Sequence, residues 1–404
     1  MPKAEPSPSA LSALRILDLS SGIAGGYCTK LLADYGAEVV KVETPGTGDS
    51  LRRWGPFPQN DPDAERGLLH WYLNANKRGL TLDVTNPAGR TILRDLLAHF
   101  DIVVESFPPA RAAALRVTYE ALRGDRNDLI WLSITPFGQT GPYADYKATD
   151  LLIQAASAWP YMGGLPDREP MKTGGFISHY VTGTYGALAG LAAWLSLRSG
   201  GTGQHIDLAA MEALQSTNEY AALSHSGPGE VKEVRGRGNL GVGTGITECQ
   251  DGHVGINVLT GNQWEMFWSF IGRPELAEDP RFQTPVGRMQ HWDEVAALIR
   301  GWAKEHTREE IFAAQEWRIP LTLIARIDEI LDFPQHAARG FFVERELPGV
   351  GPVRQPGAPF QMSASPWNLR RSAPALGQHN ADILCDTLGM QPDELVLLRR
   401  RGVI

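Results

Sequence analysis

The stretch LRILDLSSGIAGGYCTKLLADYGAEVVKVE, residues 14–43, carries the clearest structural signal in the chain. The apolar Ile16, Leu17 and Leu19 predict a short buried strand, and residues 20–26 predict a glycine-rich turn. Residues 27–35 have the apolar spacing of a helix, and the valines of 39–42 predict a second strand. A strand, a turn, a helix and a strand within about 30 residues form a βαβ unit. The sequence therefore predicts a parallel sheet covered by helices.

The same alternation continues toward the C-terminus. Strand-like segments at 79–84, 102–105 and 129–134 accompany a helical segment at 87–99, and a long apolar helix is expected at 179–199. This pattern favours a doubly wound α/β domain, in which ligands bind at the carboxyl ends of the strands.

A second, smaller α/β unit is expected beyond a glycine-rich and charged segment at 225–245. A strand at 255–258 and amphipathic helices at 262–271 and 292–306 indicate this unit. The remainder is irregular and rich in proline, and it is expected to end in one short helix near 381–388.

Composition excludes several classes of protein. The 404 residues have a formal net charge of −8, which provides no field to attract nucleic acid. The three cysteines are far apart, in no CxxC pattern, and fit a reducing compartment, so we expect a cytoplasmic protein. No apolar run reaches the roughly 18 residues that a membrane span needs.

Neither the glycines nor the histidines form a cofactor motif. Gly22, Gly25 and Gly26 join a strand to a helix, but they do not have the spacing of the dinucleotide motif GxGxxG. The ten histidines show no ligand spacing such as HExxH. We therefore expect no metal and no permanently bound cofactor.

An ordered series of short motifs resembles the class III CoA-transferase family, which includes formyl-CoA and carnitine CoA-transferases and α-methylacyl-CoA racemases. The series runs over nearly the whole chain. It comprises ILDL (16–19), LLADYGAEVVKVE (31–43), NKR (76–78), LD (82–83), VVESF (103–107), FGQTGP (137–142), TGQ (202–204) and LGQHN (376–380).

The resemblance implies a Rossmann-like large domain made from both ends of the chain, at 1–225 and 331–404, with a small domain at 226–330. It also implies a homodimer whose two chains interlock. The implied activity is the transfer of CoA between an acyl-CoA and a carboxylic acid, so the CoA thioester is a substrate.

The resemblance also assigns positions around the CoA. The matching positions for the nucleotide and the thioester are Ile23, Ala24, Leu82, Asp83, Val84, Thr85, Ser106, Phe107 and Lys147, with Asp150 beside the thioester. Thr44 and Ala114 stand where the family has basic residues, and the nearby Arg111 is a candidate to compensate for them.

One departure concerns the chemistry itself. The family's transferases carry a nucleophilic aspartate at the start of the helix that follows the Gly-rich segment, and the matching residue is His179. An imidazole cannot form the carboxylate anhydride of the usual mechanism. At a helix N-terminus its neutral form is favoured, which suits a general base or an acyl acceptor.

Three explanations remain open. His179 acts as a base or acyl acceptor with Asp150 assisting, which includes acyl-CoA lyase, hydratase or epimerase chemistry. Alternatively, the chain is the CoA-binding subunit of a heteromer whose paralogous partner supplies the aspartate. In the third explanation, Asp150 has taken over as the nucleophile. A purely structural histidine at a helix start is the competing interpretation.

Overall fold

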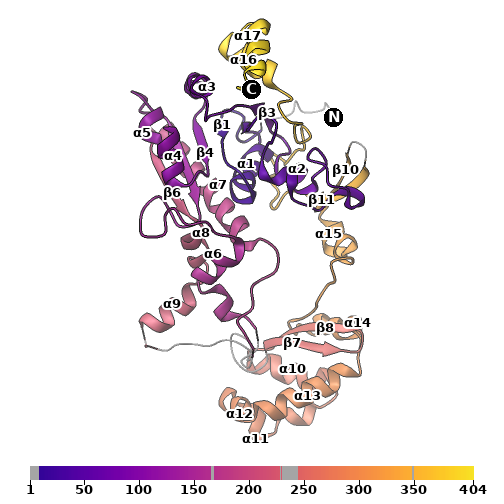
Figure 1. Ribbon diagram of the computed structural model, residues 1–404. Helices are drawn as coiled ribbons and strands as arrows, with labels where there is room; N and C mark the ends of the chain where they lie inside the picture. Colours follow the sequence, from indigo (N-terminus) through magenta and orange to yellow (C-terminus); the bar gives the residue numbers. More distant parts are fainter. Residues whose placement is uncertain (1–8, 165–167, 228, 230–243, 348–349) are drawn as a thin grey trace. The chain divides into compact units, whose positions relative to one another are not determined.

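The computed structural model describes residues 9–164, 168–227, 229, 244–347 and 350–404 (Figure 1). The chain forms two compact units. Unit 1 contains residues up to Trp159, Thr173–Tyr220 and Gly340–Ile404, and unit 2 contains Pro160–Lys172 and Ala221–Arg339. The domain limits expected from the sequence are 225/226 and 330/331, and the two units divide at 220/221 and 339/340. Most of the expected linker at 225–245 lies outside the described residues.

Unit 1 is built on a six-stranded parallel sheet with the order β3-β2-β1-β4-β5-β6. This is the strand order of a Rossmann fold, so the α/β prediction is confirmed. The strands are β1 (Arg15–Asp18), β2 (Glu38–Glu43), β3 (Arg78–Thr81), β4 (Ile102–Glu105), β5 (Ile130–Thr135) and β6 (His205–Ala209).

Helices cover both faces of this sheet because its strands alternate their apolar side chains between two cores. Ile16 packs in a core with helices α1 and α7, while the adjacent Leu17 packs in the opposite core with α3, α16 and α17. The helices of unit 1 are α1 (Ile23–Asp34), α2 (Leu68–Leu73), α3 (Pro87–Leu97), α4 (Pro109–Leu115), α5 (Tyr119–Leu122), α6 (Asp150–Ala156), α7 (Ile177–Arg198), α8 (Ala210–Gln215), α16 (Asn380–Leu388) and α17 (Pro392–Arg400).

The turn after β1 is shorter than predicted. Helix α1 begins at Ile23, so Gly25 and Gly26 are helical and only Gly22, with φ +85°, adopts the left-handed conformation. A Cβ on Gly25 would lie 2.1 Å from the Ser20 hydroxyl oxygen. The glycine is therefore needed for close packing of the helix start on the strand end, a requirement that the spacing alone does not reveal.

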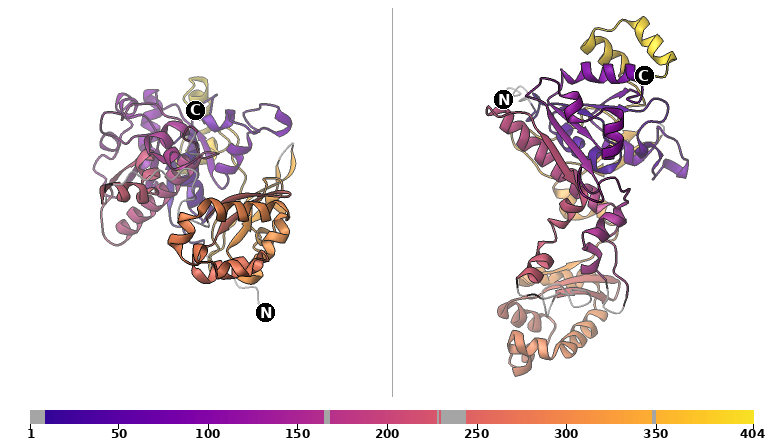
Figure 2. Two further views of the ribbon diagram at one scale, coloured as in Figure 1. Left: turned by 90° about the horizontal axis from the view of Figure 1, so that it is seen from below. Right: turned by 60° about the vertical axis from the view of Figure 1, so that its left-hand side comes forward.

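The C-terminal part is more regular than the sequence indicated. One short helix was expected, but α16 and α17 follow each other, and α16 packs beside α3 from the other end of the chain (Figures 1 and 2). A hairpin of β10 (Phe342–Leu347) and β11 (Gly351–Pro356) also replaces part of the expected irregular segment. Prolines at both ends of β11 and in its surroundings masked its strand pattern.

Unit 2 has a small antiparallel sheet of β7 (Thr244–Cys249), β8 (Gly252–Asn257) and β9 (Leu321–Leu323). Helices α10 and α13 lie against this sheet (Figure 1). Aromatic residues of α10 and aliphatic residues of α13 share one core with it. The helices of this unit are α10 (Gly261–Phe270), α11 (Pro280–Gln283), α12 (Pro285–Gln290), α13 (Trp292–Lys304), α14 (Arg308–Phe312) and α15 (Pro334–Ala338), and α9 (Glu219–Ser226) crosses the limit between the two units. Within the described residues of both units, no helix is long and apolar enough to cross a membrane.

Candidate active site

Two loops meet where the order of the sheet reverses, between β1 and β4. The backbone NH of Ser21, after β1, donates to the hydroxyl of Ser106, after β4, at 2.8 Å. The backbone NH of Gly22 donates to the carboxylate of Asp49 at 3.2 Å. Such a reversal opens a crevice at the carboxyl ends of parallel strands, where ligands of this fold bind.

The positions expected to bind the nucleotide follow the carboxyl ends of these strands. Ile23 and Ala24 follow β1, Ser106 and Phe107 follow β4, and residues 82–85 follow β3. The guanidinium of Arg111 lies 6.0 Å from the centre of the Phe107 ring. A cation and an aromatic face are thus side by side in the segment where we expected Arg111 to compensate for missing basic residues.

Not every predicted side chain is available to a ligand. Ile23 and Leu82 are each 2% exposed and belong to apolar cores, so these two positions can offer only backbone groups. The Asp83 carboxylate accepts hydrogen bonds from the NH and hydroxyl of Thr85, at 2.9 and 2.6 Å, and shapes the local turn. Val84 packs against the core, whereas Lys147 is exposed in the segment before α6.

Asp150 and His179 come together at the N-termini of two helices. Asp150 is the first residue of α6, and its buried carboxylate accepts from the NH and hydroxyl of Ser178, at 3.1 and 2.6 Å. Its other oxygen accepts from the amide of Gln154 at 2.7 Å. These bonds tie the start of α7, and with it His179, to α6. Hydrogen bonds to a carboxylate stabilise its charge and reduce its nucleophilicity, which argues against Asp150 as the attacking group.

The imidazole of His179 is half-buried at the third position of α7. Burial lowers its pKa below the ordinary value, while the nearby Asp150 carboxylate opposes this effect. No described residue forms a hydrogen bond with either ring nitrogen. The ring of Phe176 lies 6.3 Å away and stacks in turn on Trp54. A neutral imidazole is therefore available to a ligand beside a partly exposed aromatic pair.

Helix α7 brings His179 near the carboxyl end of β1 because α7 packs closely on α1. A Cβ on Gly183 would lie 2.6 Å from the carbonyl oxygen of Ala24, so only glycine permits this approach. A contact between two aromatic rings also joins these helices. The rings of Tyr27 and Tyr180 pack edge to face, with their centres 4.9 Å apart. His179 thus precedes by about one helical turn a residue in contact with Ala24.

A buried charge network lies under the first turn, and sequence spacing does not reveal it. The carboxylate of Asp18 accepts from the hydroxyls of Ser20 and Thr29, at 2.5 and 2.6 Å, and forms ion pairs with Lys41 and Lys77. Burial by itself would raise the pKa of Asp18, but the two ammonium groups and the hydroxyls lower it to about 2. The Asp and Lys residues stood in the quoted motifs, yet their shared contacts arise only in the fold.

The described residues contain no group of three or more histidine, cysteine or acidic side chains arranged to hold a metal ion.

Known proteins resemble this chain over most of its length. The family described as CoA-transferase family III matches residues 11–380. The chain is 32% identical to succinyl-CoA–D-citramalate CoA-transferase of Chloroflexus aurantiacus, with 98% of each chain covered. It is 30% identical to a subunit of succinyl-CoA:(R)-benzylsuccinate CoA-transferase of Thauera aromatica, with 97% of this chain and 98% of the relative covered.

A solved structure shares the fold. The crystal structure of a CAIB/BAIF family protein from Brucella suis superimposes with a TM-score of 0.83 at 29% identity, covering 94% of this chain and all of the other. The matched family spans most of the chain, and the named relatives are CoA-transferases. The chain therefore belongs to CoA-transferase family III and is an enzyme of that class.

Proposed function

We propose that this enzyme transfers CoA from an acyl-CoA, with succinyl-CoA as the first donor to test, to a carboxylic acid, and that His179 is the acyl acceptor. The observation that supports this role is the half-buried imidazole with a lowered pKa at the head of α7, close to the carboxyl ends of the parallel strands, where the family resemblance implies that CoA binds. Succinyl-CoA appears in the names of both relatives described above.

The proposed steps balance without an added reagent. An imidazole nitrogen attacks the thioester carbonyl, the carbon–sulfur bond breaks, and an acyl-imidazolium and the CoA thiolate form. The acceptor carboxylate takes the acyl group as a mixed anhydride and frees the imidazole. The thiolate then attacks the acceptor's carbonyl carbon and releases the donor acid. The acyl-imidazolium is cationic, so the nearby Asp150 carboxylate stabilises it.

The direct test uses the purified full chain with succinyl-CoA and a panel of acids that includes D-citramalate, (R)-benzylsuccinate and acetate. Mass spectrometry detects any new thioester. We expect one acid to acquire CoA, and we expect His179→Ala to reduce the rate by about 100-fold or more. His253→Ala, which changes an exposed histidine in β8, serves as the control. If no acid acquires CoA, transfer by this chain alone is wrong.

A second candidate is the non-nucleophilic, CoA-binding subunit of a heteromer. The observation that favours it is that one relative is named as a subunit, combined with the histidine at the usual aspartate position. This candidate predicts saturable CoA binding without turnover by the chain alone. Turnover then appears when an aspartate-bearing paralogue is added, and it is insensitive to His179→Ala.

Chemistry at the α-carbon is the remaining alternative. A neutral imidazole with a lowered pKa also suits removal of a proton next to a thioester, as in lyase, hydratase or epimerase reactions. This function predicts that the α-protons of bound succinyl-CoA exchange with deuterated solvent, and that His179→Ala abolishes the exchange. Exchange without any new thioester would favour this chemistry over transfer.

A further inference from the structure

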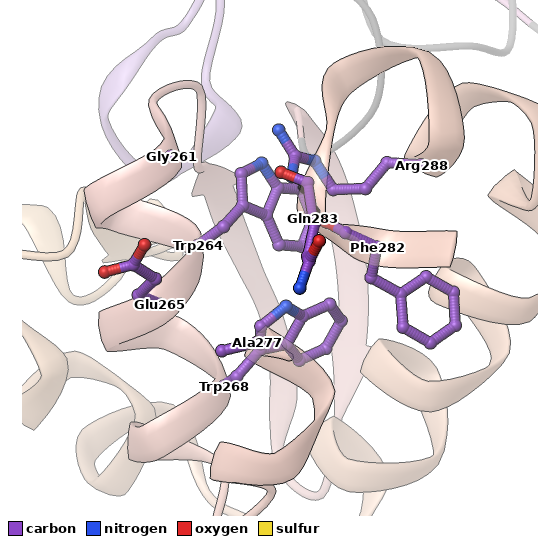
Figure 3. Close-up of a pocket in the computed structure, with 8 residues that line it drawn as sticks. All are labelled: Gly261, Trp264, Glu265, Trp268, Ala277, Phe282, Gln283 and Arg288. Carbon is purple, nitrogen blue, oxygen red and sulfur yellow. Dashed lines mark hydrogen bonds between the residues drawn. The ribbon is translucent and has the colours of Figure 1, made fainter. Parts of the chain in front are cut away.

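A pocket lies within unit 2, between α10 and the short helices α11 and α12 (Figure 3). Its volume is about 270 Å³. Its lining includes the aromatic residues Trp264, Trp268 and Phe282 together with the charged Arg288. All lining residues belong to unit 2, so the pocket is complete without any residue of the candidate active site.

Arg288 brings a buried positive charge to this pocket. The residue is only 2% exposed, and its guanidinium carbon lies 5.0 Å from the centre of the Trp264 ring. One nitrogen, Nη1, donates to the carbonyl oxygens of Phe282 and Gln283 at 2.6 and 3.0 Å. Nε and Nη2 make no hydrogen bond to any described residue. Arg288 therefore supports the α11 backbone with one nitrogen and retains donors for another group.

The charge has no acidic counterpart among the described residues. No carboxylate there forms an ion pair with Arg288, and burial, with no neighbouring charge, lowers its pKa. Glu265 also lines the pocket, but Figure 3 shows its carboxylate turned away from the aromatic rings. Arginine is almost never this buried without a partner of opposite charge. The guanidinium therefore has no carboxylate partner among the described residues.

A second donor lacks a partner in the same place. The indole nitrogen of Trp268 is buried and forms no hydrogen bond to the described part of the chain. The residue is only 1% exposed, so solvent does not reach this nitrogen either. Figure 3 shows this nitrogen on the side of the ring that faces Gln283. A buried N–H without an acceptor is costly. An oxygen atom from a ligand would satisfy it.

We propose that this pocket binds a small organic carboxylate with a flat apolar body. The carboxylate oxygens accept from the Arg288 guanidinium and the Trp268 indole, and the body lies against the rings of Trp264 and Trp268. Arg288 is the one cationic side chain in the lining, and Glu265 adds a negative charge, which together disfavour the dianionic form of phosphate. The site goes beyond CoA transfer, because it involves neither His179 nor the parallel sheet.

Fluorine NMR of the full chain labelled with 5-fluorotryptophan tests the site. Sodium benzoate is the probe, benzamide is its neutral isostere, and inorganic phosphate is the third arm. We expect benzoate to shift the Trp268 signal, which is identified by its loss in Trp268→Phe. We expect benzamide and phosphate to bind at least tenfold more weakly. Trp317→Phe, which removes a half-exposed tryptophan outside the pocket, should leave the benzoate titration unchanged.

Two variants separate binding from folding. Ala277→Leu places a larger side chain in the pocket wall and leaves both donors intact, so it should weaken benzoate binding at least tenfold. Arg288→Gln should abolish the preference for benzoate over benzamide. Because Arg288 also supports α11, circular dichroism checks that Arg288→Gln is folded. If Arg288→Gln unfolds, the result for Ala277→Leu decides the test. Equal affinity for benzoate and benzamide in the unmodified chain, unchanged benzoate binding by Ala277→Leu, or tighter binding of phosphate would each overturn the proposal.

Discussion

The hydroxyl of Ser178 donates to the carboxylate of Asp150 at 2.6 Å, and its backbone NH donates to the same oxygen at 3.1 Å. One residue thus anchors the first turn of α7 to the first residue of α6. His179 follows directly in sequence, so the position of its imidazole depends on this pair of hydrogen bonds. The contact joins residues 28 positions apart that both stand at helix starts.

Ser178→Ala should destabilise the fold measurably. The variant loses a buried hydrogen bond to a charged group, a loss of about 1.5–3 kcal/mol in the free energy of unfolding. Urea unfolding monitored by circular dichroism measures it. Thr184→Ala is the matched control, because Thr184 bonds only to a helix carbonyl at an exposed position of the same helix. Its free energy of unfolding should change by about 0.5 kcal/mol or less. Equal losses in both variants would contradict the anchoring role.

The acid side of the pH profile should report His179. Burial lowers the pKa of this imidazole in the folded chain below 6.5, its value in the unfolded chain. The unfolded chain therefore takes up the proton first as the pH falls. Relative to His179→Gln, the unmodified protein should lose stability as the pH falls from 6.5 through the lowered pKa, with no such difference above 6.5. Thermal unfolding of both proteins between about pH 5 and pH 8, the range in which histidine side chains usually titrate, measures the difference in stability.

The same titration should appear in the reaction. A mechanism that needs the neutral imidazole keeps its rate until the pH falls below 6.5 and then loses it. An acid limb with a midpoint above 6.5 would show that a different group controls the rate.

His179→Asp should restore the carboxylate nucleophile that the family resemblance implies. In this variant we expect faster transfer, by about tenfold or more, than in His179→Asn, which has a similar shape but no nucleophile. Intact-protein mass spectrometry after addition of succinyl-CoA should detect a covalent CoA adduct in His179→Asp and none in His179→Asn. If the two variants behave identically, residue 179 does not face the thioester.

Gly183→Ala should disturb both stability and activity. The added methyl group would meet the carbonyl oxygen of Ala24 at 2.6 Å, so α1 and α7 must move apart, at a cost of roughly 1–3 kcal/mol. The matched control is Gly190→Ala on the same helix, where a Cβ would make an ordinary 3.6 Å contact with Ile102. That variant should be neutral or up to about 1 kcal/mol more stable, because alanine favours helix. Equal effects of the two changes would argue against close packing at Gly183.

The periodic parts of the fold were predictable because they depend on local patterns. The alternation of residues 14–43 led to the βαβ unit, and the strand at 102–105 matches β4. The elements that were missed have weak local signals. Helix α17 begins at a proline directly after α16, and the β10–β11 hairpin contains prolines and charged residues. Such elements are stabilised by contacts that sequence spacing does not report.

The candidate site divides in the same way. The sequence alone determined that a histidine stands at residue 179, at the start of a long apolar helix, and that short polar turns follow the strands. Only the tertiary structure decided that Ser106 bonds to Ser21, that Asp150 bonds to Ser178 and that α7 rests on Ala24. The physical reason is that these contacts depend on the strand order and on how closely two helices approach. Both are set by packing between segments far apart in the chain.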